Sequence, residues 1–407
     1  MAEAVIVSAA RSGIGRAFKG SLAGERPDDL AAAMIGSALD KVPELDRGRL
    51  DDIYLGCAEP SGEAGSNMAR VASVLAGMDG VPAATVNRFC ASSIQTLRMA
   101  HHAIAAGEGS AFVSAGVESV SRYQNWAGAG ETDASNHNPK FADAEARTKA
   151  QAKSNTRWSD PRSDGALPDI YTSMGQTAEN VATSLGISRA EQDEWGVLSQ
   201  NRAEAAIKNG FYAREITPYT LADGSVFDKD DSPRAGVTMD AVSQLSPVFR
   251  EDGTVTAGNA CPLNDGAAAM VVMSDQRAAE LGLTPLARIV STSVSALSPE
   301  IMGLGPIEAT RKALARAGMS IGDIDLVELN EAFAVQVVAS ARELGIDHDK
   351  LNVHGGAIAL GHPFGMTGVR MTTTLLNGLT TTDGNLGLAT LCVGGGQGMA
   401  LIVERLS

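Results

Sequence analysis

The sequence predicts an α/β fold in which two similar halves flank an inserted segment of different composition. Its 407 residues are enough for two or three packed units rather than one ordinary core. The same order of helix, strand, loop, helix and strand occurs twice, roughly 270 residues apart, which is too long a period for a solenoid. The predicted strands are short apolar runs without alternation, as is typical of strands buried on both faces between helices. These observations indicate a duplicated α/β domain.

The first copy begins with a helical pattern over residues 28–41, which leads into an apolar run at 50–56. A strand-like segment at 86–90 comes next and precedes a helical pattern that ends near Ala106. An apolar run at 111–116 closes this copy.

The second copy repeats that order. It has a helical pattern at 306–317 and an apolar run at 324–330, and its segment 351–356 corresponds to the strand-like segment of the first copy. A helical pattern at 366–379 and an apolar run at 386–391 follow. We therefore place an N-terminal half at 1–120 plus 251–275, an inserted loop domain at 121–250 and a C-terminal half at 276–407.

The inserted segment is more polar than the two copies and is rich in Asn, Asp, Arg and Lys. Residues 128–164 show little helical or strand periodicity. A long insertion of this kind is usually a functional lid or an assembly arm, and a mobile surface loop is the alternative.

Composition excludes several classes of function. The formal net charge of −15 argues against a nucleic-acid partner, because counterion release needs a basic surface. Four cysteines without a CxxC spacing fit a reducing compartment and argue against a structural zinc site. No uninterrupted apolar run is as long as the roughly 18 residues that indicate a membrane span. The N-terminal residues lack the positive charge of a secretion signal, and their apolar run is too short for one. We expect a cytoplasmic protein without a membrane or nucleic-acid partner.

Residues 8–15 imitate a dinucleotide-binding loop, in which a glycine-rich turn opens a helix beneath a pyrophosphate. Ala9 stands where the first glycine of that pattern belongs, and Gly20, Gly24 and Pro27 would break the long helix that the motif requires. No tyrosine has a lysine four residues later, as a short-chain dehydrogenase would. The sequence therefore argues against this site.

Cys90 directly follows a strand-like segment and opens a helix. A thiol at a helix N-terminus lies at the positive end of the dipole, which favours the thiolate and lowers the pKa. We expect a nucleophile here, although a small buried cysteine at a helix start is a common alternative.

His362 lies in a glycine-rich loop at 355–365 and precedes Pro363. Glycines allow the backbone to approach a ligand closely, and proline stiffens the turn. A histidine held in this way is positioned as a base or a hydrogen-bond donor. A histidine that merely caps the loop is the alternative.

Two other strand ends carry polar groups. Cys392 follows an apolar strand and precedes a glycine run that includes Gly394. This order of strand, cysteine and glycine run resembles that of sites where backbone N–H groups converge on an oxyanion. Asn330 closes another apolar strand, and ligands of open α/β sheets bind at the carboxyl ends of strands.

Taken together, these segments resemble the thiolase family over nearly the whole chain. The matching stretches are 86–90, 174–180, 253–260, 264–269, 330–334, 361–363 and 392–398. The resemblance implies a thiolase-like fold of duplicated α/β domains, layered α-β-α-β-α, with an inserted loop domain. It also implies an acyltransferase whose substrates are coenzyme A and acyl-CoA thioesters, with no permanently bound cofactor and no metal.

The resemblance also implies roles for five residues. The cysteine that matches Cys90 is the nucleophile, and the histidine that matches His362 takes its proton. The cysteine that matches Cys392 is acid and base toward the α-carbon of acetyl-CoA. One oxyanion hole comes from the histidine and a water held by the asparagine that matches Asn330. The second comes from the backbone N–H groups of Cys90 and Gly394.

The coenzyme A contacts rest on the same resemblance. Arg234 falls where the family places an arginine near the nucleotide, and an ordinary solvated arginine is the alternative. Met174, Ala332 and Phe333 lie in the matching stretches and are further candidate contacts. Cys261 stands where many thiolases have a serine near the pantetheine arm, so that contact is in doubt and a packing role is the alternative.

Ser173 stands before Met174 where short-chain biosynthetic thiolases often have histidine. This favours a degradative 3-ketoacyl-CoA thiolase that accepts longer or bulkier acyl chains. An acetyl-CoA acetyltransferase that forms acetoacetyl-CoA is the main alternative. A fatty-acid condensing enzyme would have histidine or asparagine in place of Cys392, and a non-catalytic acyl-CoA-binding relative would lack a catalytic residue. We expect a homotetramer, with a dimer as the alternative.

Overall fold

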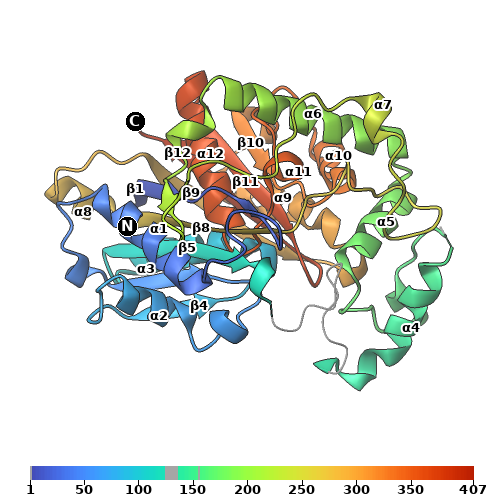
Figure 1. The fold of residues 1–407 in the computed structure, drawn as a ribbon, viewed down its shortest axis with the longest axis horizontal. Coiled ribbons are helices and arrows are strands. Elements are labelled where there is room, and N and C mark those ends of the chain that lie inside the picture. Colours follow the sequence, from blue (N-terminus) through green and yellow to red (C-terminus); the bar gives the residue numbers. More distant parts are fainter. Residues whose placement is uncertain (1, 124–135, 155) are drawn as a thin grey trace.

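A large mixed sheet passes through the centre of the computed structural model, which describes residues 2–123, 136–154 and 156–407 (Figure 1). The sheet has ten strands, in the order β10-β11-β12-β9-β1-β8-β5-β3-β4 with β2 beside β8. Their bounds are β1 (Ala4–Arg11), β2 (Gly15–Arg16), β3 (Asp52–Gly56), β4 (Ala83–Val86), β5 (Ala111–Ser119), β8 (Asn264–Ser274), β9 (Ala287–Ala296), β10 (Leu326–Leu329), β11 (Leu386–Val393) and β12 (Gln397–Arg405).

The pairing of the strands repeats from one half of this sheet to the other. In the first half β3 is parallel to β5, β5 is antiparallel to β8, and β8 is antiparallel to β1. In the second half β10 is parallel to β11, β11 is antiparallel to β12, and β12 is antiparallel to β9. The two halves meet in a short β1–β9 ladder, in which Val5 pairs with Arg288 and Ile6 with Ala287. This repetition agrees with the predicted duplication.

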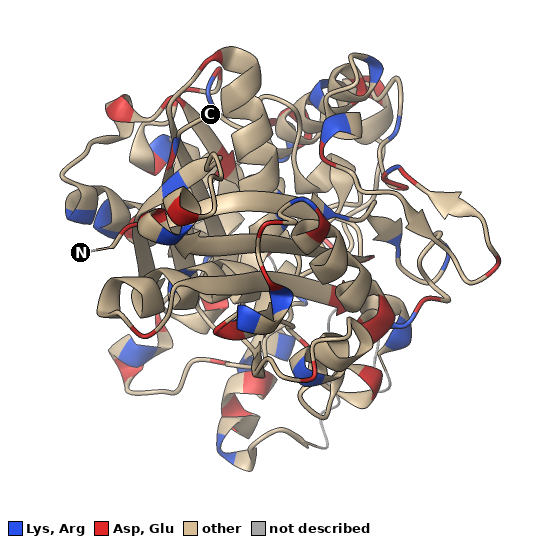
Figure 2. Ribbon diagram, turned by 90° about the vertical axis from the view of Figure 1, so that its left-hand side faces the viewer, with Lys and Arg blue, Asp and Glu red and all other residues tan. Residues whose placement is uncertain are grey.

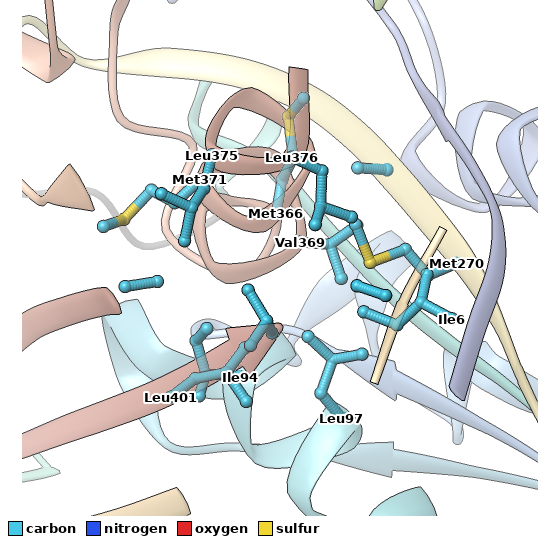
Figure 3. Close-up of a cluster of buried hydrophobic side chains, with 14 of the residues drawn as sticks. Ile6, Ile94, Leu97, Met270, Met366, Val369, Met371, Leu375, Leu376 and Leu401 are labelled. Carbon is cyan, nitrogen blue, oxygen red and sulfur yellow. The ribbon is translucent and has the colours of Figure 1, made fainter. Parts of the chain in front are cut away.

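Helices lie on both faces of each half and between the halves. The helices α1 (Pro27–Asp40) and α2 (Met68–Leu75) cover the outer face of the first half, whereas α9 (Gly305–Ala317) and α10 (Ala334–Leu344) cover that of the second. The helices α3 (Ser92–Ala106) and α12 (Thr367–Thr382) pack together in the middle, where Ile94 and Leu97 face Val369 and Leu376 (Figure 3). The predicted α-β-α-β-α layering is confirmed.

The inserted segment supplies further helices, among them α4, α5, α6 and α7. There α4 (Ala142–Gln151) and α5 (Met174–Leu185) lie away from both chain ends (Figure 1). Further along, α6 (Arg189–Lys208) packs on α10 and on α11 (Ala357–Leu360). The small hairpin β6 (Tyr219–Thr220) and β7 (Val226–Phe227) and the short helices α7 (Met239–Val242) and α8 (Asp275–Glu280) complete the described chain. The domain boundaries after residues 120, 250 and 275 stay a prediction.

Two predicted strands are wrong in whole or in part. Residues 351–356 form a turn with one isolated bridge, between Val327 and Leu351. Asn352 has a φ of +46°, and its side chain both accepts from the Leu329 N–H and donates to the Leu329 carbonyl, each over 2.8 Å. That side chain replaces the backbone of a further strand. In the first copy, β4 ends at Val86 and α3 begins at Ser92, so Cys90 lies in a 3₁₀ turn between them.

The stretch 128–164, whose sequence shows little helical or strand periodicity, nevertheless contains a helix in its described part. Residues 128–135 and 155 lie outside the described residues, but α4 occupies 142–151. Only Ala144 of that helix is buried, so its sequence has no apolar stripe from which a helix could be predicted.

Charged side chains lie on the peripheral helices and loops, whereas the sheet contains few of them (Figure 2). No helix in the described part of the chain has the length and apolar character needed to cross a bilayer.

Candidate active site

Cys90 lies in the 3₁₀ turn Phe89–Ala91 directly before α3. The turn is held by its neighbours. The Phe89 N–H donates to Asn87 Oδ1 over 2.8 Å, and Ser92 Oγ accepts from the Arg88 N–H over 2.9 Å. Phe89 takes a left-handed φ of +43°, a strained conformation for a bulky residue that is found mostly at functional sites. The thiol is thereby placed at the helix start, half-buried.

The backbone N–H groups of Gly394 and of Cys90 itself lie near the Cys90 sulfur and act to lower its pKa. Both would stabilise a negative charge at the sulfur. Burial outweighs them and, together with the nearby Glu118 carboxylate, raises the pKa of Cys90 to about 12. The expectation of a lowered pKa is therefore wrong for the free protein, because the thiol is desolvated and no cation compensates for the loss of water. Attack by this sulfur needs a base that removes its proton.

His362 is buried in the loop between α11 and α12, and its ring is held at both nitrogens. Nδ1 lies 2.7 Å from Thr367 Oγ1, and that hydroxyl donates to the Pro363 carbonyl over 2.7 Å. Because the hydroxyl proton is used there, Nδ1 must carry the imidazole proton and donate to Thr367. Burial lowers the pKa of His362 to about 3, and Arg370 contributes to this shift. Nε2 is therefore unprotonated at neutral pH, and its lone pair can accept a hydrogen bond from the Asn330 Nδ2 amide.

The backbone of this loop also needs its glycine. Gly361 has a φ of +116°, and a Cβ added to it would lie 2.6 Å from the side chain of Asn264. That side chain accepts the His362 N–H over 2.9 Å. Gly361 thus lets Asn264 fix the backbone of the histidine.

Asn330 follows β10, and its Nδ2 lies 3.2 Å from His362 Nε2. Its backbone N–H donates to the Thr390 carbonyl over 3.0 Å, which ties it to β11 two residues before Cys392. Asn330 Oδ1 is buried and has no hydrogen-bond partner among the described residues. A buried acceptor of this kind is costly unless a ligand or water engages it, so it marks a binding position.

Cys392 lies near the end of β11 and is buried. Burial raises its pKa well above the usual value, and the thiols of Cys90 and Cys261 raise it further. Cys261 lies beside the Asn330 loop, because its N–H donates to the Ala332 carbonyl over 3.0 Å. Three of the four cysteines are therefore close enough to influence one another electrostatically.

The glycine turn 394–396 carries one of the N–H groups at Cys90. Gly395 and Gly396 have φ values of +74° and +77°, and a Cβ on Gly396 would lie 2.3 Å from the Leu297 carbonyl oxygen. Arg88 Nη1 donates to Gln397 Oε1 over 2.7 Å and so ties the Cys90 turn to this one. Only glycine permits this backbone path.

The candidate coenzyme A contacts divide into two groups. Met174, Ala332 and Phe333 pack in one apolar cluster with Cys392, so the structure brings them to the site. Arg234 lies in a surface loop, where its backbone N–H donates to Gln200 Oε1 over 3.0 Å and its side chain is exposed.

Two supporting carboxylates were not predicted. Glu118, at the end of β5, accepts from Tyr123 Oη over 2.7 Å and from the Ala58 and Gly365 N–H groups over 2.8 Å each. The sequence feature that could have indicated Glu118 is an acidic residue alone within an apolar strand. The other is Glu331.

Glu331 follows Asn330 and is fully buried. It accepts from Trp195 Nε1 over 3.1 Å, Ser199 Oγ over 2.6 Å and the Ile358 N–H over 3.1 Å. Both carboxylates thus fix loops that carry site residues, Glu118 the loop of His362 and Glu331 the loop of Asn330. Thr367 was missed as well, although it lies about one helical turn after His362.

Comparison with known proteins agrees with this geometry. Family models described as the N-terminal and C-terminal domains of thiolase match residues 4–276 and 283–405. The chain is 43% identical to an acetyl-CoA acetyltransferase of Pseudomonas aeruginosa over the whole of both chains. It is 41% identical to a 3-ketoacyl-CoA thiolase of Bacillus subtilis, covering 99% of this chain and 100% of that protein. A beta-ketoadipyl-CoA thiolase of P. aeruginosa is 42% identical over 99% of both chains.

A solved structure is similar too. The acetyl-CoA acetyltransferase of Bacillus anthracis superposes with a TM-score of 0.86 at 37% identity, covering 100% of this chain and 99% of that one. With both family models matched and relatives aligned along its full length, the chain belongs to the thiolase family of acyltransferases.

Proposed function

We propose that this thiolase cleaves 3-ketoacyl-CoA with free coenzyme A, giving acetyl-CoA and a shortened acyl-CoA by way of a thioester on Cys90. The observation that carries the proposal is the buried His362 ring, whose Nε2 lies 3.2 Å from Asn330 Nδ2, together with the thiols of Cys90 and Cys392, which are close enough for Cys90 to raise the pKa of Cys392. A covalent intermediate splits one difficult acyl transfer into two steps and gives ping-pong kinetics.

In the first step Cys90 Sγ attacks the 3-keto carbon while its proton passes to His362 Nε2. The N–H groups of Cys90 and Gly394 stabilise the oxyanion that forms on that carbonyl. The bond between C2 and C3 then breaks, and the electron pair remains on C2 as the enolate of acetyl-CoA. Cys392 protonates C2, which suits a thiol that burial keeps protonated, while His362 and Asn330 stabilise the thioester oxygen of the enolate.

In the second step coenzyme A replaces acetyl-CoA. Cys392, left as a thiolate, takes the proton of the coenzyme A thiol as that sulfur attacks the acyl carbon on Cys90, and the displaced Cys90 thiolate regains its proton from His362. The same backbone N–H groups stabilise the second oxyanion. The reverse sequence is the condensation of two thioesters.

We infer the degradative direction and longer acyl chains from Ser173, which replaces the histidine of short-chain biosynthetic members. Coenzyme A would bind between the cluster of Met174, Ala332 and Phe333 and the exposed Arg234, with Cys261 near its pantetheine arm. The full-length similarity to two acetyl-CoA acetyltransferases favours acetoacetyl-CoA synthesis as the second candidate. A homotetramer in the cytoplasm completes the proposal.

The direct test is an assay of thiolysis. Purified protein mixed with acetoacetyl-CoA and free coenzyme A should remove the 3-ketoacyl absorbance, and omission of coenzyme A should limit the loss to a single turnover. Complete inactivity toward acetoacetyl-CoA and longer 3-ketoacyl-CoA thioesters alike would contradict the proposal.

Thr367 tests the positioning of His362. Thr367→Val removes the acceptor of the Nδ1 proton, so the tautomer is no longer defined. We expect kcat to fall about tenfold to a hundredfold, as for the loss of one buried hydrogen bond that matters in the transition state. Thr367→Ser keeps the hydroxyl and should retain most of the activity. Equal losses in the two variants would show that the methyl group, and not the hydroxyl, is what matters.

The pKa values of His362 and Cys90 predict that activity changes little with pH in the neutral range. A His362 pKa of about 3 and a Cys90 pKa of about 12 leave both groups neutral throughout the neutral range. We therefore expect kcat/KM for the 3-ketoacyl substrate to change less than about twofold between about pH 5.5 and 8, because no unperturbed histidine controls it. An acid limb near the ordinary histidine pKa would contradict the neutral pair, provided that His362→Asn removes that limb.

A further inference from the structure

A positive charge is buried close enough to His362 to influence its pKa. It belongs to Arg370 of α12, which is 1% exposed. Neither Nε nor Nη1 of this side chain has a hydrogen-bond partner among the residues that the structure describes. A guanidinium does not lose its proton in proteins, so its burial without hydrogen bonds costs free energy. A charge kept under these conditions beside a site residue is a candidate for a role in that site.

Arg370 has one ion-pair partner in the described part of the chain, Glu328 of β10. Arg370 Nη1 lies 3.5 Å from Glu328 Oε2, and the two side chains are 1% and 6% exposed. Burial raises the pKa of Glu328 to about 8, although Arg370 opposes the shift. Glu328 is therefore largely protonated at neutral pH, and it leaves most of the positive charge of Arg370 without compensation.

Three further ionisable groups face this pair, and none of them neutralises Arg370. Burial raises the pKa of Tyr212 well above its usual value, so this phenol is uncharged. The carboxylates of Glu215 and Glu331 add to the rise in the Glu328 pKa that burial causes, and so help to keep Glu328 protonated. Glu215 has its own cation, Arg11, at 2.8 Å, and the donors to Glu331 are given above.

Arg370 and Glu328 lie next to the two residues that hold the His362 ring. Arg370 follows Thr367 by three residues in α12, so the two side chains share one face of the helix. Glu328 precedes Asn330 by two residues at the end of β10, where alternate side chains share a face. The charged pair thus joins the same helix and the same strand end that position the ring. After burial, Arg370 is the group that lowers the pKa of His362.

We propose that Arg370 is a positioning residue that acts through His362: its charge opposes protonation of the ring, so that His362 holds the Cys90 proton only briefly. The inference rests on the proposed function, in which the proton passes from Cys90 Sγ to His362 Nε2 and later returns. A less stable imidazolium is a stronger acid, so it donates a stronger hydrogen bond to the enolate oxygen. It also gives the proton back readily when coenzyme A displaces the Cys90 sulfur. In the free protein the same charge keeps Cys90 and His362 neutral.

The test is the rate at which iodoacetamide alkylates Cys90 without substrate, because this reagent reacts with the thiolate. The modified Cys90 peptide is measured by mass spectrometry. Arg370→Met removes the charge and keeps much of the length of the side chain. At about pH 6.5 it should raise the fraction of the thiolate–imidazolium pair and speed alkylation about tenfold, since a neighbouring charge changes a protonation equilibrium by about this factor or more.

Glu328→Gln is the matched control. It removes the other member of the same 3.5 Å contact but replaces a group that is already neutral at this pH, so alkylation should stay within about twofold of the wild-type rate. At about pH 9.5 Glu328 of the wild type is ionised and offsets part of the Arg370 charge. Wild type should then be alkylated about threefold faster than Glu328→Gln. This second comparison tests the inference even if Arg370→Met does not fold.

A His362→Asn background shows whether the charge acts through the ring. In that background Arg370→Met should not change the alkylation rate. The inference is overturned if the acceleration persists there, if Glu328→Gln gives the same acceleration at about pH 6.5, or if Arg370→Met is no faster than wild type. Equal rates of wild type and Glu328→Gln at both pH values, together with an unfolded Arg370→Met, would also overturn it. Alkylation needs no substrate, so failure to cleave any 3-ketoacyl-CoA would contradict the proposed function separately.

Discussion

Replacement of Cys90 by serine is expected to lower kcat/KM for thiolysis by roughly 10⁴-fold or more, the scale seen when a catalytic nucleophile is lost. A loss of that size corresponds to about 5.4 kcal/mol of transition-state stabilisation. The serine hydroxyl keeps the size and the N–H donors of the site but is a much weaker nucleophile. His362, whose pKa is about 3, is too weak a base to compensate for a less acidic group.

The same variant separates nucleophilic catalysis from binding. With acetoacetyl-CoA and no coenzyme A, wild-type protein should gain the mass of one acetyl group, and Cys90→Ser should gain none. Cys57→Ser is the matched control, because Cys57 is a buried cysteine whose thiol donates to Glu118 Oε1 over 3.6 Å. It should be acylated as wild type is. An acetyl group on Cys90→Ser that maps to another cysteine would show that the nucleophile is elsewhere.

The fold could be predicted from the sequence where local pattern and burial agree. The apolar runs of β3, β5, β10 and β11 are buried between helices, and such strands need no alternation to be visible. The segment 351–356 was misread because the Asn352 side chain, and not backbone, pairs with Leu329. That pairing joins residues far apart in sequence, so no local pattern reveals it.

The site could be predicted as a set of residues but not as an electrostatic environment. His362, Asn330 and Cys392 could be proposed from the sequence because each stands at a strand end or in a glycine loop, and their catalytic roles stay a prediction. The direction of the Cys90 pKa shift was wrong because the helix start is a local feature, whereas desolvation depends on everything packed around the thiol. Glu118 reaches the His362 loop from another strand, which no spacing along the chain indicates.

Cys392→Ser should divide the reaction into two halves. We expect condensation of two acetyl-CoA molecules to fall about 10²–10⁴-fold, the usual loss when a positioned acid or base is removed. Transfer of an acetyl group from acetyl-CoA to Cys90 involves no proton at the α-carbon, so exchange of labelled coenzyme A with acetyl-CoA should remain within about tenfold of wild type.

The difference between the loss of condensation and the loss of coenzyme A exchange measures how much Cys392 contributes to proton transfer at the α-carbon. Burial and the neighbouring thiols hold the pKa of Cys392 well above its usual value, so it is protonated in the free protein and acts as an acid in cleavage. In condensation it must first lose that proton, which costs free energy that the oxyanion donors at Asn330 and His362 have to offset. Asn330→Ala should therefore slow condensation and thiolysis alike, because both directions pass through the same enolate. If Cys392→Ser condenses as fast as wild type, another group moves the α-proton, and Cys392 is not the acid and base that acts beside the nucleophile Cys90.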